Sequence, residues 1–430
     1  MSKEVLAWSF WDWGAAAINA VMLTFVFSVY LTSASFGNPA SNASALSTGM
    51  AITGVIIALV APVLGSRADA GGRRKLWLGI HTAVIVLACA ACFFVKPAPE
   101  FLPLGIVLLC IATLGSELAS VNYFAMLPQI STKATMGRVS GIGWSFGYLG
   151  GILALAIVLF GFIEPIVDWA GSSSDDGLNL RLVAIFCAAW TLIFCAPVLF
   201  AVPEVPAQAK AKVSWLDSYK QLFAHIGRLW RTDRTTLWFL LSSAVYRDGL
   251  AAVFTFGGII ASTVFGMSPG EVIIFAIAGN VIAALGAFVG GQLDDKVGPR
   301  AVILTCLFGL LVTGTGIFVS PGPEGFWVFG LAMCLLVGPA QSASRSLLAR
   351  RTTPENAGEL FGLYTTTGRA ISFLAPALFG LGTALALSAG IKDDEATRYG
   401  IIGIMVVIAG GLVLFLLGRP RPDAAAADAA

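Results

Sequence analysis

Charged side chains are scarce in this chain of 430 residues, because Asp, Glu, Lys and Arg together make up only 12% of the sequence. Soluble domains carry about 25%, so the chain lacks the charge that a water-exposed surface of this size requires. Hydrophobic residues reach 57%, and the mean hydropathy is +0.86. The composition excludes an ordinary soluble globule and indicates an integral membrane protein.

Three further absences narrow the function. The 26 Lys and Arg residues nearly balance the 24 Asp and Glu residues, which leaves no basic excess for a nucleic-acid-binding face. The sequence contains no Gly-x-x-x-x-Gly-Lys-Ser/Thr loop, which argues against a built-in ATP motor. The two histidines, His81 and His225, have no companions at metal-site spacing. We therefore expect no nucleic acid, metal or cofactor as a partner, and no enzymatic activity.

The seven cysteines are odd in number, and all of them lie in apolar stretches. Cys89 and Cys92 form a C-x-x-C pair, a spacing that also occurs in redox and metal sites. The pair lies on an expected membrane helix with no His nearby and no βαβ pattern around it. We therefore interpret both as small packing residues.

Long apolar stretches are abundant. A helix needs about 20 apolar residues to cross a bilayer, and the sequence offers twelve such stretches without the alternation typical of membrane strands. We predict an all-α membrane protein with twelve transmembrane helices, at residues 6–32, 47–66, 75–96, 102–126, 139–163, 181–201, 236–264, 270–291, 301–319, 325–347, 359–386 and 398–418.

Basic residues concentrate in alternate loops. If the N-terminus is cytoplasmic, nearly all loop Lys and Arg residues lie on that side, and the exceptions are Lys96, Arg181, Lys392 and Arg398. Because cytoplasmic loops are enriched in Lys and Arg, we predict that both termini are cytoplasmic.

The chain divides into two halves around a polar linker. Residues 1–202 and 235–430 each contain six predicted spans, and a short disordered tail is expected at the end of the second half. In the linker, 203–234, apolar residues recur every three or four positions, which predicts an amphipathic helix on the cytoplasmic membrane surface. We interpret the linker as a tether, with a regulatory or partner site as the alternative. Many secondary transporters consist of such repeats and bind their solute between them.

A short polar motif recurs at equivalent loops of the two halves. The segments from Gly65 to Gly72 and from Gly291 to Gly298 both read Gly-x-x-x-Asp-x-x-Gly, with basic residues beside them. Glycines permit tight turns and close approach of helices, and aspartates can meet a helix N-terminus or a basic partner. We expect gates here, with a pure topology signal as the alternative; the candidate gating residues are Asp69, Arg73, Asp295 and Arg300.

These loops resemble the signature between helices 2 and 3, and between helices 8 and 9, of the major facilitator superfamily. Other segments resemble one of its branches, the vacuolar amino-acid effluxer-like (autophagy-related) family and its bacterial relatives. They are Trp11-Asp12-Trp13, Asn122 to Pro128, Ser140 to Gly151, Tyr246 to Gly249, Gln341 to Ser346 and Glu359 to Tyr364. The resemblance covers residues 8–418. It implies the major facilitator fold, with two pseudo-symmetric six-helix bundles, in a monomeric multi-pass protein of a bacterial plasma membrane.

The resemblance also implies a function. It is that of a secondary active transporter that moves a small polar solute across the lipid bilayer by alternating access. Amino acids or similar metabolites are the leading substrates, efflux is the suggested direction, and protons are the candidate coupling ion. Two alternatives stay open: a multidrug or hydrophobic-compound exporter, favoured by the 11% aromatic content, and an assembly or receptor protein that kept the fold without transport.

Ionisable residues within the spans are costly to bury and therefore mark candidate sites. Asp12, Glu117 and Asp248 are candidate proton sites. Arg369, in the middle of its span, is a candidate for binding an anionic group, whereas Arg345 either clamps a carboxylate or locks two helices together. The candidate substrate-binding set is Asp12, Asn19, Tyr123, Asp248, Gln341, Arg345 and Arg369.

Only one of the adjacent residues Arg247 and Asp248 can face the interior of the bundle. Adjacent residues on a helix point about 100° apart, so both cannot face the interior, and we expect Asp248 to do so. With Arg247, the spans contain three cations and three acids, so structural ion pairs among them are the alternative to binding roles.

Overall fold

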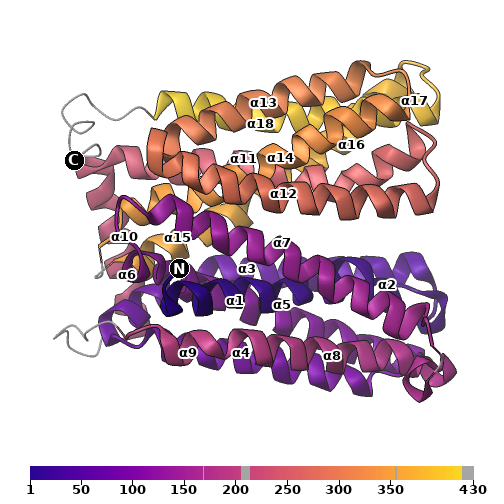
Figure 1. The fold of residues 1–430 in the computed structure, drawn as a ribbon, viewed down its shortest axis with the longest axis horizontal. Helices are drawn as coiled ribbons and strands as arrows, with labels where there is room; N and C mark the ends of the chain where they lie inside the picture. The colour runs from indigo at the N-terminus through magenta and orange to yellow at the C-terminus, as the bar shows by residue number, and fades with distance from the viewer. Residues whose placement is uncertain (168, 205–213, 354–355, 419–430) are drawn as a thin grey trace.

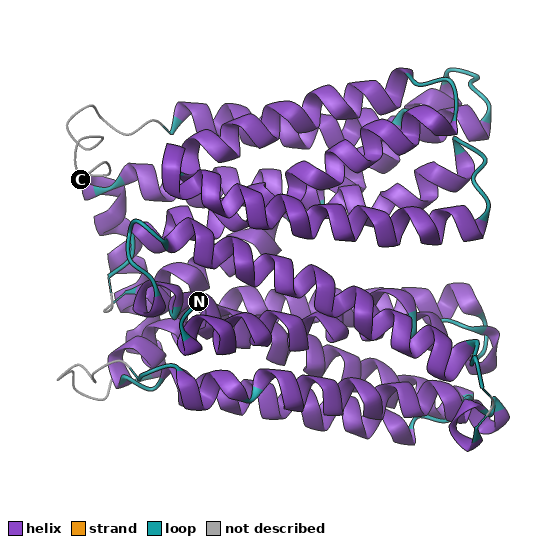
Figure 2. Ribbon diagram, viewed as in Figure 1, coloured by secondary structure: helices purple, strands orange, loops and turns teal. Residues whose placement is uncertain are grey.

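The computed structural model describes residues 1–167, 169–204, 214–353 and 356–418. Within these ranges, twelve helical segments are long and apolar enough to cross a membrane, which confirms the predicted number. They form two bundles that lie side by side, and helices joined by loops make up the described chain (Figures 1 and 2). The tail expected after residue 418 lies outside the described residues, as do residues 205–213 of the linker.

The first bundle holds six spans. The first consists of α1 (Lys3–Ala17), the π-helical η1 (Ile18–Phe25) and α2 (Phe27–Leu31). The others contain α3 (Pro39–Gly71), α4 (Arg74–Ala91), α5 (Leu102–Ala125) with α6 (Leu127–Ile130), α7 (Met136–Val158), and α8 (Leu178–Cys195) with α9 (Pro197–Ala201). Short turns of helix join or extend them: η2 (Ala34–Phe36), η3 (Cys92–Phe94), η4 (Pro99–Phe101), η5 (Leu159–Ile163), η6 (Ala170–Ser172) and η7 (Asp175–Gly177).

The second bundle repeats this arrangement. Its spans contain α11 (Arg234–Thr263), α12 (Pro269–Val297), α13 (Pro299–Val319), α14 (Pro323–Arg350), α15 (Ala357–Ile371) with α16 (Leu374–Ser388), and α18 (Gly400–Leu417), which the short α17 (Asp393–Arg398) precedes.

Several helices begin where the sequence contains a start signal. Proline lacks a backbone N–H and is favoured at the first helical position, and α3, α12, α13 and α14 all begin with one. Ser268 and Glu271 form a reciprocal capping box at the start of α12. These local signals fix the ends of the spans before any packing between helices is considered.

The linker contains the helix α10 (Trp215–Thr232), which lies across one end of the molecule (Figure 1). Leu222 is buried against the bundles, and the Tyr219 hydroxyl donates to the carbonyl of Leu59 in α3 at 3.1 Å. We call this end of the molecule the linker end and the opposite end the far end.

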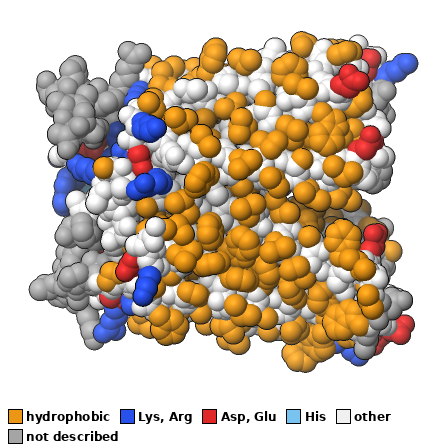
Figure 3. Space-filling model, in the orientation of Figure 1, with side chains coloured by type: hydrophobic (Ala, Val, Ile, Leu, Met, Phe, Trp, Pro, Cys, Tyr) orange, Lys and Arg blue, Asp and Glu red, His pale blue; other side chains and the backbone are white. Residues whose placement is uncertain are grey.

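Charge is distributed unequally between the two ends. On the face shown in Figure 3, most Lys and Arg side chains lie near the linker end, Asp and Glu side chains lie at both ends, and hydrophobic side chains cover the belt between the ends. The belt has the composition that a lipid-facing surface requires. The cytoplasmic location of the termini stays a prediction from the basic loops.

The two bundles touch closely at the linker end along two seams. In the α3–α15 seam, a Cβ built on Gly358 would lie 2.5 Å from the carbonyl oxygen of Gly65. In the α7–α12 seam, a Cβ built on Gly291 would lie 2.5 Å from the carbonyl oxygen of Gly137. Any larger side chain would overlap the opposite backbone, so glycine allows the bundles to close here. Toward the far end α7 and α12 diverge (Figure 1).

Candidate functional site

A cavity of about 580 Å³ lies between the two bundles. Helices α1, α5 and α7 line it from the first bundle, and α11, α12, α14, α15 and α18 line it from the second. It extends from Asp12 and Arg345 to Phe25 and Phe326, which lie toward the far end. Its volume is typical of sites for small ligands.

An ion pair between the bundles forms one boundary of the cavity. Arg345 Nη1 of α14 lies 3.1 Å from Asp12 Oδ2 of α1, and the Tyr123 hydroxyl donates to the same oxygen at 2.8 Å. Trp8 and Trp11 stack on the Tyr123 ring, with centroid separations of 4.4 and 4.3 Å. The aromatic cluster therefore fixes the position at which Asp12 meets the opposite bundle.

Most donors of Arg345 already have acceptors. Its Nε donates to Ser140 Oγ at 3.0 Å, and its Nη2 donates to the Ser140 carbonyl at 2.7 Å. The guanidinium also lies over the ring of Trp8 at 4.7 Å, and the side chain is only 1% exposed. Of the two roles expected for Arg345, this geometry favours the lock between helices over the clamp on a solute carboxylate.

A second ion pair joins the bundles through α5 and α15. Arg369 donates through Nη2 to Oε1 of Glu117, and both side chains are about one third exposed. Glu117 is among the residues that line the cavity, and Arg369 is not. The candidate anion-binding cation is therefore already neutralised by one of the candidate proton sites.

The structure reverses the expected orientations of Arg247 and Asp248. Arg247 lines the cavity, and Asp248 does not. The Asp248 carboxylate instead accepts the backbone N–H of Ala375 at 2.6 Å, in the first turn of α16. The break between α15 and α16 exposes backbone N–H groups that need an acceptor. Asp248 supplies this acceptor and therefore turns away from the cavity. The prediction that Asp248 faces the cavity was wrong.

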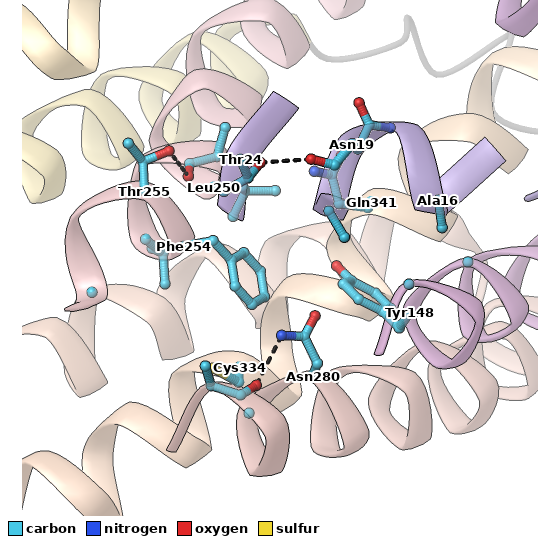
Figure 4. Close-up of a pocket in the computed structure, with 18 of the residues that line it drawn as sticks. Ala16, Asn19, Thr24, Tyr148, Leu250, Phe254, Thr255, Asn280, Cys334 and Gln341 are labelled. Atoms are coloured by element: carbon cyan, nitrogen blue, oxygen red, sulfur yellow. Dashed lines mark hydrogen bonds between the residues drawn. The ribbon is translucent and has the colours of Figure 1, made fainter. Parts of the chain in front are cut away.

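Of the other candidate substrate-binding residues, two line the cavity and one lies in the surrounding core. Asn19 and Gln341 line the cavity, whereas Tyr123 is fully buried and acts through Asp12. The sequence analysis did not single out Trp144, Tyr148 or Phe254 as candidate site residues. All three line the cavity, and the Tyr148 and Phe254 rings from opposite bundles lie 6.0 Å apart. Figure 4 shows Phe254, Tyr148 and Asn280 around the same space.

Glycines on α7 allow this helix to approach α1 closely. Small residues permit such close packing of membrane helices, and a Cβ on Gly150 would overlap the backbone of Trp13 in α1. That packing sets the rotation of α7 and turns Tyr148 toward the cavity. The aromatic wall follows from the packing of α7 and could not be found from the composition.

The first motif connects α3 to the opposite bundle. The Asp69 carboxylate accepts the backbone N–H of Glu359, at the start of α15, at 3.1 Å. Its basic partner is Arg74, with both side chains 1% exposed, and Arg74 also donates to the carbonyl of Ala125. The expected partner Arg73 is exposed. The gating prediction for Arg73 is therefore corrected to Arg74, because a left-handed turn at Gly72 places the later arginine inside.

The second motif makes the matching contact from α12. Asp295 accepts the N–H groups of Gly137 and Arg138, at the start of α7, at 2.8 and 3.0 Å. Arg350 lies 3.2 Å from Asp295. The predicted gating residue Arg300 instead donates to the Phe415 carbonyl at 3.1 Å, within its own bundle. The cation beside Asp295 is therefore Arg350 and not the predicted Arg300.

No cluster of metal ligands is present in the described ranges. Groups of three or more His, Cys, Asp and Glu side chains at metal-binding separation do not occur there. Cys89 and Cys92 are buried and unbonded to each other. The polar groups that line the cavity are carboxylates, two arginines, amides and hydroxyls, and aromatic rings accompany them.

Known proteins share both the sequence pattern and the fold. The family model described as "Vacuole effluxer Atg22 like" matches residues 32–417. The chain is 24% identical to the uncharacterized MFS-type transporter YxiO of Bacillus subtilis, over 96% of this chain and 94% of that protein. It is 22% identical to autophagy-related protein 22 of Kluyveromyces lactis, over 59% of this chain and 54% of that protein, so it spans about half of that relative.

Solved structures show the same architecture. The proton:xylose symporter XylE superposes with a TM-score of 0.72 at 14% identity, covering 95% of this chain and 94% of XylE. The transporter FucP in its outward conformation gives a TM-score of 0.71 at 16% identity, covering 97% and 99% of the two chains. These likenesses establish the fold of two six-helix bundles.

Proposed function

The chain belongs to the Atg22-like vacuole effluxer family of the major facilitator superfamily and is a multi-pass membrane transporter, and we propose that it moves a small polar solute by alternating access. The observation that carries the proposal is the cavity between the bundles, bounded by the Asp12–Arg345 pair. The cavity extends toward the far end, while glycine contacts hold the linker end together.

Alternating access requires a second state in which the linker end opens and the far end closes. The Asp12–Arg345 and Glu117–Arg369 pairs each join one bundle to the other, so both must separate or rearrange when the bundles rock. The Asp69 and Asp295 gates must also release the helix starts that they hold. The state described here is accordingly the one in which a solute enters or leaves at the far end.

We propose proton coupling through the two pairs. A proton on Asp12 or Glu117 would remove the negative charge that holds the arginine of the opposite bundle. Each pair would then favour the closed linker end when ionised and permit opening when protonated. Both carboxylates line the cavity, so water entering from the far end reaches them.

The proposed substrates are amino acids or similar small metabolites. The family description supports export as the direction. Asn19, Gln341 and Asn280 offer polar groups on the wall, and Trp144 and Phe254 offer apolar surface. The aromatic wall also favours a second candidate, export of hydrophobic compounds.

Flux measurements in proteoliposomes test this proposal. With an amino-acid mixture and an imposed pH gradient, we expect gradient-driven accumulation by the wild type and loss of the gradient dependence in Asp12→Asn and Glu117→Gln, while exchange without a gradient persists. Asp175→Asn is the control, because Asp175 is exposed and begins the short helix η7 at the far end. Equal responses to the gradient in all four proteins would remove the coupling proposal, and accumulation of hydrophobic dyes instead of amino acids would favour the second candidate.

A further inference from the structure

Three arginines lie within the membrane-spanning helices near the cavity, and two of them are neutralised across the interface between the bundles. Arg345 pairs with Asp12, and Arg369 pairs with Glu117. In the described part of the chain, the third, Arg247, has no carboxylate within 4 Å. An intramembrane cation is expensive unless it has a partner or a function. Arg247 therefore lacks the structural explanation that applies to the other two.

Arg247 is held by a cation–π contact and one long hydrogen bond, and not by an ion pair. Its guanidinium carbon lies 3.7 Å from the centre of the Tyr364 ring, and Nη1 reaches the Tyr364 carbonyl at a long 3.5 Å. A guanidinium has five N–H donors, so most of them have no acceptor among the described residues. Gly368 lies beside it, where a Cβ would approach Nη1 to 3.6 Å. The result is a fixed cation with unused donors on the cavity wall.

Arg247 also occupies the right depth for a solute site. It lies near the middle of the thirty-residue helix α11, and the cavity reaches it together with Asn19 and Gln341 of other helices. Solute sites between transporter repeats lie near the midplane of the bilayer. The position and the open donors are independent observations that indicate the same role.

We propose that Arg247 binds the carboxylate of the transported solute, an inference that rests on the proposed transport function. A guanidinium matches a carboxylate with two parallel hydrogen bonds. A phosphate group carries more charge than this single open arginine balances, and Lys does not occur among the residues that line the cavity. The site therefore selects small monocarboxylates, including amino acids, over amines and uncharged solutes of equal size.

Binding at Arg247 would also reach the gate. Tyr364, on which the guanidinium stacks, belongs to α15, and the start of α15 is held by Asp69 through Glu359. A carboxylate that draws Arg247 away from Tyr364 would loosen the contact between α11 and α15. Solute binding and the release of the α3–α15 seam would thus both act on α15.

Matched probes test the assignment on the purified full-length protein. L-Leucine has both charged groups, 4-methylpentanoate lacks the amino group, and 3-methylbutylamine lacks the carboxylate. We expect the two carboxylates to raise the thermal unfolding temperature of the wild type and the amine to leave it unchanged. In Arg247→Gln we expect a loss of about tenfold or more in apparent affinity for the carboxylates. Arg247→Lys should retain part of it, and Arg231→Gln, on the exposed face of α10, is the matched control.

Several outcomes would overturn the proposal. They are equal stabilisation of the wild type by the amine, unchanged carboxylate affinity in Arg247→Gln, and no binding of any member of a panel of amino acids and monocarboxylates with two to eight carbons. If Arg247→Gln does not fold, the wild-type comparison of acid and amine decides alone. Flux separates the two proposals: Arg247-dependent binding without flux in proteoliposomes removes transport but keeps the site, whereas flux of amines that survives Arg247→Gln keeps transport and removes the site.

Discussion

The α3–α15 and α7–α12 seams close the same end of the molecule by the same kind of contact. In each, an aspartate of one bundle accepts backbone N–H groups at the start of a helix in the other bundle, Asp69 at α15 and Asp295 at α7. The positive end of a helix favours such a carboxylate. Both seams also depend on glycines whose backbones nearly touch.

The seams differ in how the aspartate charge is balanced. Asp69 and Arg74 are almost completely buried, and Arg74 is the cation that pairs with Asp69. Asp295 shares Arg350 with Asp294, and the Asp295–Arg350 pair is partly exposed. The α3–α15 seam is also joined by the linker, because His225 of α10 lies 2.7 Å from Glu359. The contact between an aspartate and a helix start is therefore common to both halves. The α3–α15 seam differs in that its ion pair is more deeply buried and contains one cation and one carboxylate.

The largest expected effect comes from filling the backbone contact of the α3–α15 seam. In Gly358→Val the side chain would meet the Gly65 carbonyl and Asp69, so we expect a loss of about 3 kcal/mol or more in unfolding free energy, or a shift to an open linker end. Thermal unfolding and hydrogen exchange at the start of α15 measure this. Gly54→Val is the control, because Gly54 lies in α3, the partner helix of this seam, and has open space around it. Equal behaviour of the two variants would show that the seam is not tight.

The charge comparison gives the next largest effect. Asp69→Asn leaves Arg74 buried without its carboxylate, which costs about 3–5 kcal/mol. Asp295→Asn leaves Arg350 paired with Asp294, so we expect about 1–2 kcal/mol. Hydrogen exchange should rise at the Glu359 amide in the first variant and at the Gly137 and Arg138 amides in the second. A larger loss in Asp295→Asn would reverse our ranking of the seams.

The smallest expected effect concerns the linker. His225→Gln removes a partly exposed pair with Glu359, so we expect at most about 1 kcal/mol and faster exchange confined to α10. The double variant with Glu359→Gln should add little further loss, because both changes remove the same contact. Full additivity of the two losses would indicate that the residues act separately.

Local patterns predicted the architecture well. The count of twelve spans follows from runs of apolar residues, which need no knowledge of the partner helix. The positions of Asp69 and Asp295 also followed from the repeated motif. The cations paired with these aspartates did not follow from the motif. Arg73 and Arg74 are adjacent in the sequence, and only the turn at Gly72 decides which one is buried.

The cavity shows the limit of such reasoning more clearly. Asp12 and Glu117 were found because a buried charge is conspicuous in an apolar sequence. The orientation of α11 could not be predicted in this way. From the sequence, Arg247 and Asp248 are equally able to face the cavity, and only the break before α16 presents an N–H group that Asp248 accepts. Trp144 and Phe254 gave no signal, because aromatic residues suit a lipid-facing surface as well as a cavity wall.

The sequence by itself determined that this protein crosses a membrane with two related sets of six helices and carries a few charges at membrane depth, because hydrophobicity and repetition are properties of the chain alone. Only the tertiary structure decided which charges neutralise one another and which cation remains open to the cavity. Pairing across two bundles depends on helix rotation, and rotation is set by backbone contacts between glycines that lie far apart in the chain.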